Sequence, residues 1–381
     1  MRLSDLPTPC LILDRQILQH NITRMAQAVA RHGVALRPHM KTAKSIDVAR
    51  MALAANPAKP GVENDGHEAD GITVSTLAEA EYFTGHGLSN MLYAVGITPQ
   101  KLDQVAKLNA AGAGLMVITD DAMVAEAISA HSLPPRTLIE IDTGEHRGGL
   151  SPDDPMLLEI ATRLGRNLAG VCTHAGHSYG ARSDQDLQQI ADAERTGALR
   201  AAERLRAAGH AAPIVSIGSS PTALADGNFE GITELRAGVY MFGDLFQAEI
   251  GTHGPDDIAV SVLTSVIGHR PAQNRLLVDA GAIALSKDRS TEATGNDQGY
   301  GLAIDLAGNR SLGRSIVSRA YQEHGLIDLD PALPTTMPPI GSPLRILPNH
   351  SCMTAAAYDR YFVVDTGRDA VVAIWPRVNG W

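Results

Sequence analysis

Short apolar runs alternate with amphipathic segments through most of the first 240 residues. The runs are rich in Val, Ile and Leu and have the length of buried strands, while the stretches between them repeat apolar positions at helical spacing. The expected strands cover residues 34–37, 72–75, 91–95, 115–119, 137–142, 170–174, 213–217 and 232–236. The expected helices cover residues 45–55, 77–83, 99–110, 121–130, 154–164 and 184–208.

This alternation predicts an α/β fold. Eight strands separated by helices are typical of a (β/α)8 barrel of the TIM type. A doubly wound open sheet is the alternative, but the chain has no Gly-x-Gly-x-x-Gly after the first strand, which favours the barrel.

Beyond residue 240 the pattern changes to extended, β-branched segments separated by Gly, Pro and Asn, which predict a mainly β domain. These segments cover residues 258–268, 275–285, 344–347, 361–365 and 370–375. One more strand is expected at residues 9–14, before a helix at 15–31. We therefore expect a barrel domain over residues 15–245 and a β domain over residues 246–381, to which the strand within residues 1–14 is added.

One segment, residues 56–70, interrupts the alternation. It contains two prolines, two glycines and four acidic residues, with little apolar content. It predicts an exposed loop, and a lid over an active site is the alternative.

Composition narrows the classes of partner. The chain has 32 Lys and Arg against 42 Asp and Glu, a formal net charge of −10, and no basic run of five. Nucleic acid and membrane are therefore not expected as partners. There is no apolar run of about 18 residues, which indicates a cytoplasmic protein. Cys10, Cys172 and Cys352 are too few and too widely spaced for a disulfide framework.

A lysine follows the first expected barrel strand. The carboxyl ends of barrel strands form the active-site face of this fold. A neutral lysine attacks aldehydes, and a partly desolvated position beside the cationic Arg37 or Lys44 would favour the neutral form. Lys41 is therefore a candidate Schiff-base lysine, with a solvated surface lysine as the alternative.

Polar and glycine-rich segments follow later strands as well. Gly218, Ser219 and Ser220 come directly after the seventh strand and before a short helix, a pattern that suits a phosphate group. The alternative is that Ser220 only caps the helix. A lysine across the barrel mouth from a phosphate site is typical of pyridoxal phosphate enzymes.

Four further residues are candidates on this rim. Arg147 has a planar guanidinium that suits the cofactor's phenolic oxygen or a substrate carboxylate. His174 could stack on a pyridine ring. Tyr179 and Tyr240 could direct their hydroxyls to the ring nitrogen or the phosphate. For each, a packing or surface role is the alternative, and His177 has no assigned role.

A second candidate site lies in the β domain. In an extended chain residues two apart point to the same side, so His350 and Cys352 would converge on one ion. Imidazole and thiolate suit zinc, with manganese or magnesium as alternatives, and two protein ligands leave positions for water or substrate. Gln322 and His324 are candidates for supporting this site or contacting the substrate.

Together these motifs resemble the metal-activated fold-type III pyridoxal phosphate enzymes. This alanine-racemase-like family includes D-serine dehydratase, D-threo-3-hydroxyaspartate dehydratase and D-threonine aldolase. The resemblance spans nearly the whole chain. It is carried by RPHMKT at 37–42, GITVST at 71–76, EAE at 79–81, IEID at 139–142, GSSPT at 218–222, ELRAG at 234–238, QEHG at 322–325 and PNHSC at 348–352.

The resemblance implies roles for individual residues. Lys41 would bind the cofactor covalently, and His350 with Cys352 would bind the metal. Since relatives are dimers, it also implies a homodimer. The other residues that it places around the cofactor are His39, Arg147, His174, Tyr179, Gly218, Ser219, Ser220, Gly238 and Tyr240.

The expected activity is dehydration of a D-3-hydroxy amino acid such as D-serine or D-threo-3-hydroxyaspartate, giving a 2-oxo acid and ammonia. Cys352 favours this activity, because the dehydratases of the family pair His with Cys at the metal. The first alternative is an aldolase that gives glycine and an aldehyde. A non-catalytic pyridoxal phosphate carrier is the second, although such carriers lack the β domain. A racemase would need no metal, and no second proton-transfer group is evident for it.

Overall fold

The computed structural model describes residues 1–56, 71–333 and 337–381. The described chain divides into two compact units. The sheet unit contains Met1–Ile22 and Val239–Arg377, and the barrel unit contains Thr23–Gly238 and Val378–Trp381. Apart from Asn56, the loop expected at 56–70 lies outside the described residues.

The barrel unit is built on eight parallel strands within the described ranges, in the order β2-β9-β8-β7-β6-β5-β4-β3. A bridge between His39 and Thr73 joins the two ends of this sheet. The (β/α)8 barrel is therefore confirmed. The strands are β2 (Ala35–Pro38), β3 (Ile72–Val74), β4 (Met91–Gly96), β5 (Leu115–Thr119), β6 (Thr137–Ile141), β7 (Leu168–Thr173), β8 (Ile214–Ile217) and β9 (Glu234–Ala237).

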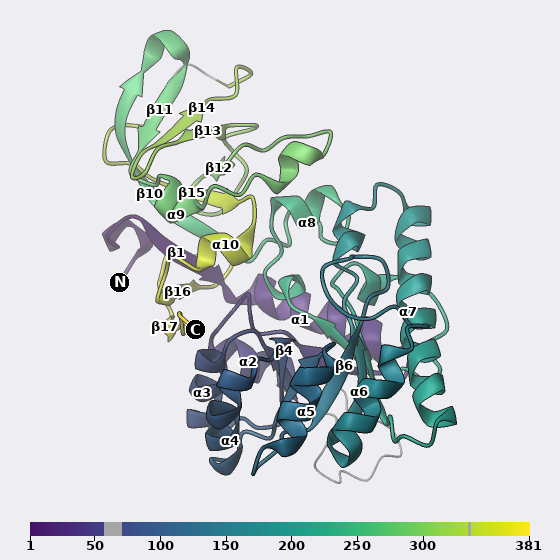
Figure 1. Ribbon diagram of the computed structural model, residues 1–381. Helices are drawn as coiled ribbons and strands as arrows, with labels where there is room; N and C mark the ends of the chain where they lie inside the picture. Colours follow the sequence, from purple (N-terminus) through teal and green to yellow (C-terminus); the bar gives the residue numbers. More distant parts are fainter. Residues whose placement is uncertain (57–70, 334–336) are drawn as a thin grey trace. The chain divides into compact units, whose positions relative to one another are not determined.

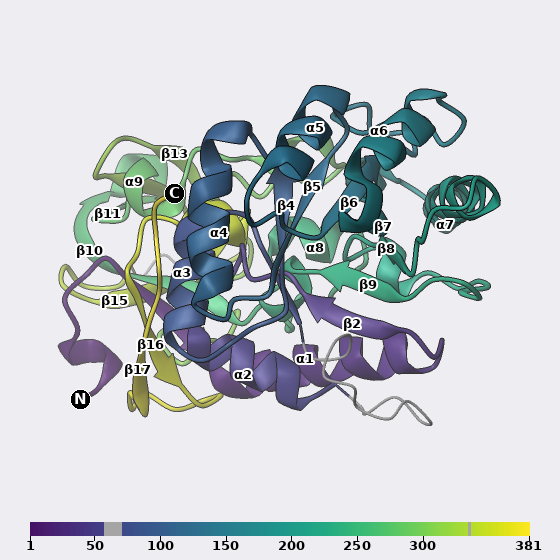
Figure 2. The same cartoon turned by 60° about the horizontal axis from the view of Figure 1, so that its bottom comes forward.

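Helices cover the outside of these strands (Figures 1 and 2). Several begin at a side-chain cap: Thr76 accepts the N–H of Glu79 at 3.0 Å, and Asp121 accepts that of Val124 at 2.8 Å. Such caps satisfy first-turn N–H groups that have no partner within the helix. The helices are α2 (Ile46–Ala54), α3 (Leu77–Gly85), α4 (Leu102–Ala110), α5 (Ala122–Ala130), α6 (Met156–Leu164) and α7 (Asp184–Ala207).

The inside of the barrel is part apolar and part charged. Because side chains alternate between the two faces of a strand, every second residue fills the interior. Charged and hydroxyl side chains on β2, β8 and β9 form one buried network, in which Arg37 pairs with Glu234 at 2.7 Å and Glu234 accepts from Ser216 at 2.5 Å. The apolar cluster consists of Leu92, Met116, Ile118, Leu138, Ala169, Cys172 and Ile214.

The sheet unit contains a nine-stranded sheet within the described ranges, in the order β11-β14-β13-β12-β15-β10-β1-β16-β17. The mainly β fold expected for this part is confirmed. Strand β1 is antiparallel to β10 and parallel to β16. The strands are β1 (Cys10–Asp14), β10 (Val260–Arg270), β11 (Arg275–Val278), β12 (Gly301–Ile304), β13 (Ile316–Ala320), β14 (Gly325–Asp328), β15 (Pro343–Pro348), β16 (Arg360–Val364) and β17 (Ala373–Pro376).

The short helices of this unit were not expected, and one of them corrects a prediction. Residues 275–285 are not one extended segment, because α9 (Ala282–Leu285) follows β11. A Cβ atom at Gly281 would lie 2.4 Å from the carbonyl oxygen of Tyr321, so only glycine lets the chain turn into α9 here. The other short helices of this unit are α8 (Leu245–Glu249) and α10 (Ser351–Ala355). The long helix expected at 15–31 is present as α1 (Arg15–Ala30), which begins in the sheet unit and continues into the barrel unit.

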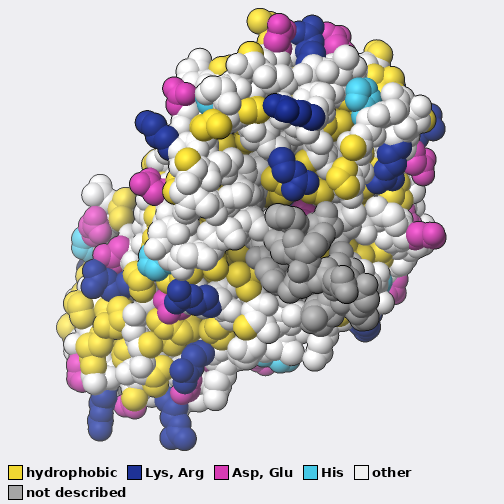
Figure 3. All heavy atoms as spheres, turned by 90° about the horizontal axis from the view of Figure 1, so that it is seen from below, with side chains coloured by type: hydrophobic (Ala, Val, Ile, Leu, Met, Phe, Trp, Pro, Cys, Tyr) yellow, Lys and Arg dark blue, Asp and Glu magenta, His cyan; other side chains and the backbone are white. Residues whose placement is uncertain are grey.

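Charged side chains of both signs are scattered over the face drawn in Figure 3. Within the described ranges, no helix is long and apolar enough to cross a membrane.

Candidate active site

Lys41 lies just beyond the carboxyl end of β2, on the barrel face where the site was expected. Its side chain is exposed. Its backbone N–H donates to Nδ1 of His39 at 3.3 Å, so this ring nitrogen is an acceptor and carries no proton. The turn after β2 therefore places the amine next to an uncharged imidazole.

The two cations expected to favour a neutral Lys41 are occupied elsewhere. Arg37 points toward the amino end of the barrel, where it pairs with Glu234 and donates to the carbonyl of Asn90 at 2.8 Å. Lys44 pairs with Glu79 at 3.2 Å. The expectation about Arg37 and Lys44 was therefore wrong, because a buried or half-buried cation pairs with a carboxylate in preference to lying beside another cation.

Two histidines beside Lys41 are held neutral. Burial, followed by the charges of Lys41 and Arg236, lowers the pKa of His39 well below its ordinary value. Burial and the charge of Lys41 lower the pKa of His174 to about 3. His174 donates from Nδ1 to the carbonyl of Gly218 at 2.9 Å. Lys41, His39 and His174 thus belong to one neighbourhood at the ends of β2 and β7.

The lowered pKa of His174 predicts a pH-dependent stability in cofactor-free protein. The unfolded chain protonates this imidazole below its ordinary pKa of 6.5, whereas the folded chain does not until about 3. Its contribution to the free energy of unfolding is thus intact above pH 6.5 and is lost as the pH falls toward 3, by up to ~1.4 kcal/mol per pH unit. His174→Asn keeps a donor for Gly218 and removes this titration.

Denaturant unfolding of both proteins at pH 7 and pH 4.5 measures the effect. Wild-type protein should lose about 2 kcal/mol more than His174→Asn over this interval. The same loss in both proteins would show that this imidazole titrates normally in the folded chain.

The segment after β8 is tightly bonded within itself and to its neighbours. Ser219 and Ser220 are both buried, each with 1% exposure. The hydroxyl of Ser219 lies 2.8 Å from that of Ser178 and 3.0 Å from that of Thr222. The N–H of Ser219 donates to Thr222 at 3.0 Å. The expected helix after this segment is a single 3-10 turn, η5 (Thr222–Leu224).

A buried carboxyl group underlies this segment. Glu194, on α7, accepts the N–H of Gly218 at 2.9 Å and that of Ala175 at 3.0 Å. Burial raises its pKa, while the bonds from Thr222 and these two N–H groups oppose the shift. Glu194 thus ties the chain after β7 to the chain after β8, and the N–H of Gly218 is directed to this carboxyl group.

Arg147 is linked to the chain after β7 through the carboxylate of Glu145. Its guanidinium lies 3.3 Å from Glu145, which in turn accepts the N–H of Gly176 at 2.9 Å. Gly176 begins η4 (Gly176–Gly180), which contains Tyr179 and His177. The carbonyl of Tyr179 accepts from Arg182 at 3.1 Å. The structure therefore brings Arg147 to the loop that follows His174.

Arg236 is a residue of this site for which sequence reasoning predicted no role. It lies on β9 and is 6% exposed. It donates to the hydroxyl of Ser216 and to the carbonyl of Thr173, and its charge lowers the pKa of both His39 and His174. Its position within the ELRAG segment was the available signal. Gly238 follows, and a Cβ atom there would lie 2.9 Å from the carbonyl oxygen of His39.

Tyr240 belongs to the sheet unit, in η6 (Val239–Met241). It is buried, and burial raises the pKa of its hydroxyl. The backbone carbonyl of Tyr240 accepts from Nε2 of His253 at 2.8 Å. His253 therefore anchors the main chain that carries Tyr240.

His350 and Cys352 approach each other, although not in the way the sequence suggested. The chain is not extended here: Ser351 begins α10, so His350 occupies the N-cap position and Cys352 lies in the first helical turn. Burial lowers the pKa of His350, but the hydrogen bonds with Asp288 and Cys352 outweigh it and raise this pKa to about 11. The imidazole and the sulfur therefore lie within hydrogen-bonding reach, brought together by a helix start.

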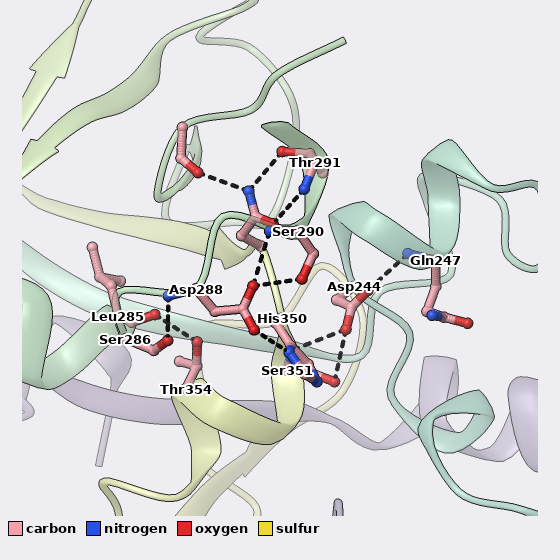
Figure 4. Close-up of polar contacts among 12 residues, drawn as sticks. Asp244, Gln247, Leu285, Ser286, Asp288, Ser290, Thr291, His350, Ser351 and Thr354 are labelled. Carbon is pink, nitrogen blue, oxygen red and sulfur yellow. Dashed lines mark hydrogen bonds and ion pairs between the residues drawn. The ribbon is translucent and has the colours of Figure 1, made fainter. Parts of the chain in front are cut away.

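Asp288 orients the imidazole of His350. Its carboxylate lies 2.6 Å from Nδ1, so Nδ1–H donates and Nε2 is the atom left for an ion (Figure 4). The backbone N–H of Ser290 holds the same carboxylate at 2.9 Å. No local pattern in the sequence indicated Asp288, because it is 62 residues away from His350 along the chain.

Gln322 and His324 lie on the exposed turn between β13 and β14. The carbonyl of Gln322 accepts the N–H of Ile283 at 3.2 Å, and that of Tyr321 accepts the N–H of Ala282 at 2.6 Å. The turn thus packs against α9. The structure gives Gln322 a side-chain bond to Glu323 at 3.3 Å.

The side chains at both places suit the groups that the resemblance implies. In the barrel unit, an exposed amine stands beside two uncharged imidazoles and a set of hydroxyls, which suits an aldehyde cofactor with a pyridine ring and a phosphate. In the sheet unit, an oriented imidazole and a thiol suit a borderline-soft divalent ion. Within the described residues, no group of three or more His, Cys, Asp or Glu side chains that could hold a metal ion is present.

Comparison with known families gives the class of protein. The family model of the alanine racemase N-terminal domain matches residues 13–245, and that of the putative serine dehydratase domain matches residues 259–364. The chain therefore belongs to the alanine-racemase-like, fold-type III pyridoxal phosphate family, in the branch with a serine dehydratase domain.

Individual relatives narrow this class. The chain is 43% identical to D-threo-3-hydroxyaspartate dehydratase of Delftia sp. (strain HT23), over 99% of this chain and 98% of that protein. It is 29% identical to D-serine dehydratase of Dictyostelium discoideum, over 98% of this chain and 97% of that protein. It is 28% identical to D-threonine aldolase of Arthrobacter sp., over 98% of this chain and 92% of that protein.

A solved structure matches over the full length. It is a cysteine-to-alanine mutant of D-threo-3-hydroxyaspartate dehydratase in its metal-free form, with a TM-score of 0.92, 42% identity and complete coverage of both chains.

Proposed function

We propose that this protein is a pyridoxal phosphate- and metal-dependent dehydratase of D-3-hydroxy amino acids. The observation that carries the proposal is the approach of His350 and Cys352, with Asp288 on the imidazole, in a domain of the serine dehydratase type. The dehydratase similarity at 43% identity, against 28% for the aldolase, supports elimination of water over cleavage of the carbon chain. D-threo-3-hydroxyaspartate and D-serine are the proposed substrates.

The barrel residues would hold the cofactor and move a proton. Lys41 would bind the cofactor covalently and, once displaced by the substrate amine, take the α-proton as a general base. When bound, pyridoxal phosphate delocalises the electron pair left at Cα. The neutral imidazoles of His39 and His174 would accept a flat ring without adding charge. Arg147, held by Glu145, would bind an anionic oxygen.

The residues of the sheet unit would hold the metal. Nε2 of His350 and the sulfur of Cys352 are the two protein ligands, and Asp288 keeps the tautomer in which Nε2 is free to bind. A divalent ion held there would supply Lewis-acid chemistry for loss of the substrate's β-hydroxyl. Loss of the β-hydroxyl as water and later uptake of water release a 2-oxo acid and ammonia.

Product identity tests the proposed reaction. With cofactor and metal present, D-threo-3-hydroxyaspartate should yield oxaloacetate and ammonia, and D-serine should yield pyruvate and ammonia. A coupled assay for ammonia and an assay for glycine, run on D-serine, D-threonine and both 3-hydroxyaspartate diastereomers, distinguish the activities. Glycine with an aldehyde as the main products would replace the dehydratase by an aldolase.

Three finer properties belong to the same proposal. We propose zinc as the ion, because a thiolate ligand favours it over manganese or magnesium. We propose a homodimer in the cytoplasm, on the resemblance and on the composition of the chain. Metal analysis of the purified protein and its mass in solution test the first two.

A further inference from the structure

The segment with the proposed metal ligands covers residues 348–352. Within it, residues 349, 350 and 351 each form hydrogen bonds with different partners. Asn349 is buried and donates to Thr291 and to the carbonyl of Gly299, both at 2.7 Å. His350 is held by Asp288. Ser351 is buried and is held by Asp244 (Figure 4). The segment is therefore fixed before His350, at His350 and at Ser351, the residue between the two proposed metal ligands.

Asp244 makes two kinds of contact and is 1% exposed. One carboxylate oxygen accepts the N–H of Gln247 at 2.8 Å and so caps α8. The other accepts the N–H of Ser351 at 2.9 Å and lies 3.3 Å from its hydroxyl. Both oxygens are thus engaged by N–H and O–H donors.

The bond to Ser351 matters because α10 lacks a cap of its own. His350 occupies the N-cap position, and its side chain makes no capping hydrogen bond. The first N–H groups of a helix have no partner within the helix, and a buried one without a partner costs about 1–3 kcal/mol. Asp244, 107 residues away along the chain, supplies this partner at the first residue of α10. One carboxylate therefore caps two helices.

We infer that Asp244 is a positioning residue for the metal site: by capping α10 from a distance, it holds the sulfur of Cys352 at the place where it can share an ion with His350. This inference rests on the proposed function, since it assumes that His350 and Cys352 bind a metal. It assigns different work to the two carboxylates, because Asp288 orients the imidazole and Asp244 orients the helical turn that carries the sulfur.

Two substitutions of Asp244 test this role. Asp244→Asn keeps the shape of the side chain but turns one acceptor into a donor, so it cannot serve both Gln247 and Ser351. Asp244→Ser keeps a good cap for α8 and is too short to reach Ser351, so it protects folding while removing the distant bond. In cofactor-free protein, titration calorimetry with zinc should show a dissociation constant raised roughly 10- to 100-fold in both variants.

The control is Asp121→Asn. Asp121 caps α5 in the barrel unit with the same geometry, at 2.8 Å from the N–H of Val124. This variant should bind zinc as wild type does. A second readout uses cobalt in place of zinc, because sulfur-to-cobalt charge transfer reports the thiolate ligand directly. The band should weaken in folded Asp244→Ser protein, whereas a purely structural role would lower stability and leave the band intact.

The outcomes separate this inference from the proposed function. If wild type binds zinc and the His350→Ala variant does not, the metal site stands, and unchanged zinc affinity with an unchanged cobalt band in folded Asp244→Asn and Asp244→Ser would overturn the role of Asp244 alone. If wild type binds no divalent ion at this motif, the proposed metal site is wrong and the inference is overturned with it.

Discussion

Replacing Lys41 by alanine should abolish both the visible absorbance of bound cofactor and the release of ammonia. The primary amine of Lys41 can form a Schiff base with an aldehyde, whereas the imidazoles of the adjacent His39 and His174 cannot. Loss of a positioned base alone costs roughly 10²- to 10⁴-fold in rate. With covalent attachment lost as well, we expect kcat to fall by roughly 10³-fold or more. Absorbance spectra after addition of pyridoxal phosphate, followed by an ammonia assay, measure both effects.

Lys44→Ala is the matched control for Lys41→Ala. Lys44 lies three residues further along, but its ammonium group pairs with Glu79 at 3.2 Å. Removing it should leave the cofactor spectrum unchanged. If Lys41→Ala kept the spectrum and ammonia release within about tenfold of wild type, another residue would have to bind the cofactor.

Removing the sulfur of Cys352 should stop elimination while leaving the cofactor bound. A Lewis acid on a leaving group contributes several kcal/mol to the transition state, which corresponds to roughly 10²- to 10⁴-fold in rate. The Cys352→Ala protein should lose its zinc, and its rate of ammonia release should fall by this factor. EDTA should have the same two effects on wild-type protein. The cofactor spectrum should survive in both, because Lys41 belongs to the barrel unit and the ion to the sheet unit.

The neighbouring residue gives the control for Cys352→Ala. Met353 is the next residue in α10 and its side chain is 52% exposed. Met353→Ala should retain zinc and activity. Full turnover of wild-type protein freed of metal, as shown by elemental analysis, would rule out the Lewis-acid scheme.

The barrel and its lysine were predictable because they follow from local periodicity. Parallel strands buried on both faces leave continuous apolar runs, and the residue after such a run lies at the active face of a barrel. The strands at 115–119 and 137–141 were located almost to the residue in this way. By contrast β12, β13 and β14 were not predicted, because strands of four or five residues give too short a pattern to recognise.

The sequence supplied the candidate residues of the site, whereas most of their contacts could not be predicted from it. Arg37 was expected to act on Lys41, yet its partner Glu234 is 197 residues away and draws the guanidinium to the other end of the barrel. His350 and Cys352 were expected on an extended chain, yet a helix start brings them together. Arg236 lies in the ELRAG segment that was recognised in the sequence, but no role was predicted for it. For Asp288 and Asp244, no nearby sequence pattern indicated a role.

The sequence by itself determined the alternation of strands and helices in the barrel, the lysine after the first barrel strand and the His350–Cys352 pair as candidate metal ligands. These follow from spacing and residue type within a few positions. Only the tertiary structure decided which carboxylates form hydrogen bonds with His350 and Ser351. Buried charges and unpaired N–H groups must find partners wherever the fold brings them close, and those of His350 and Ser351 lie 62 and 107 residues away.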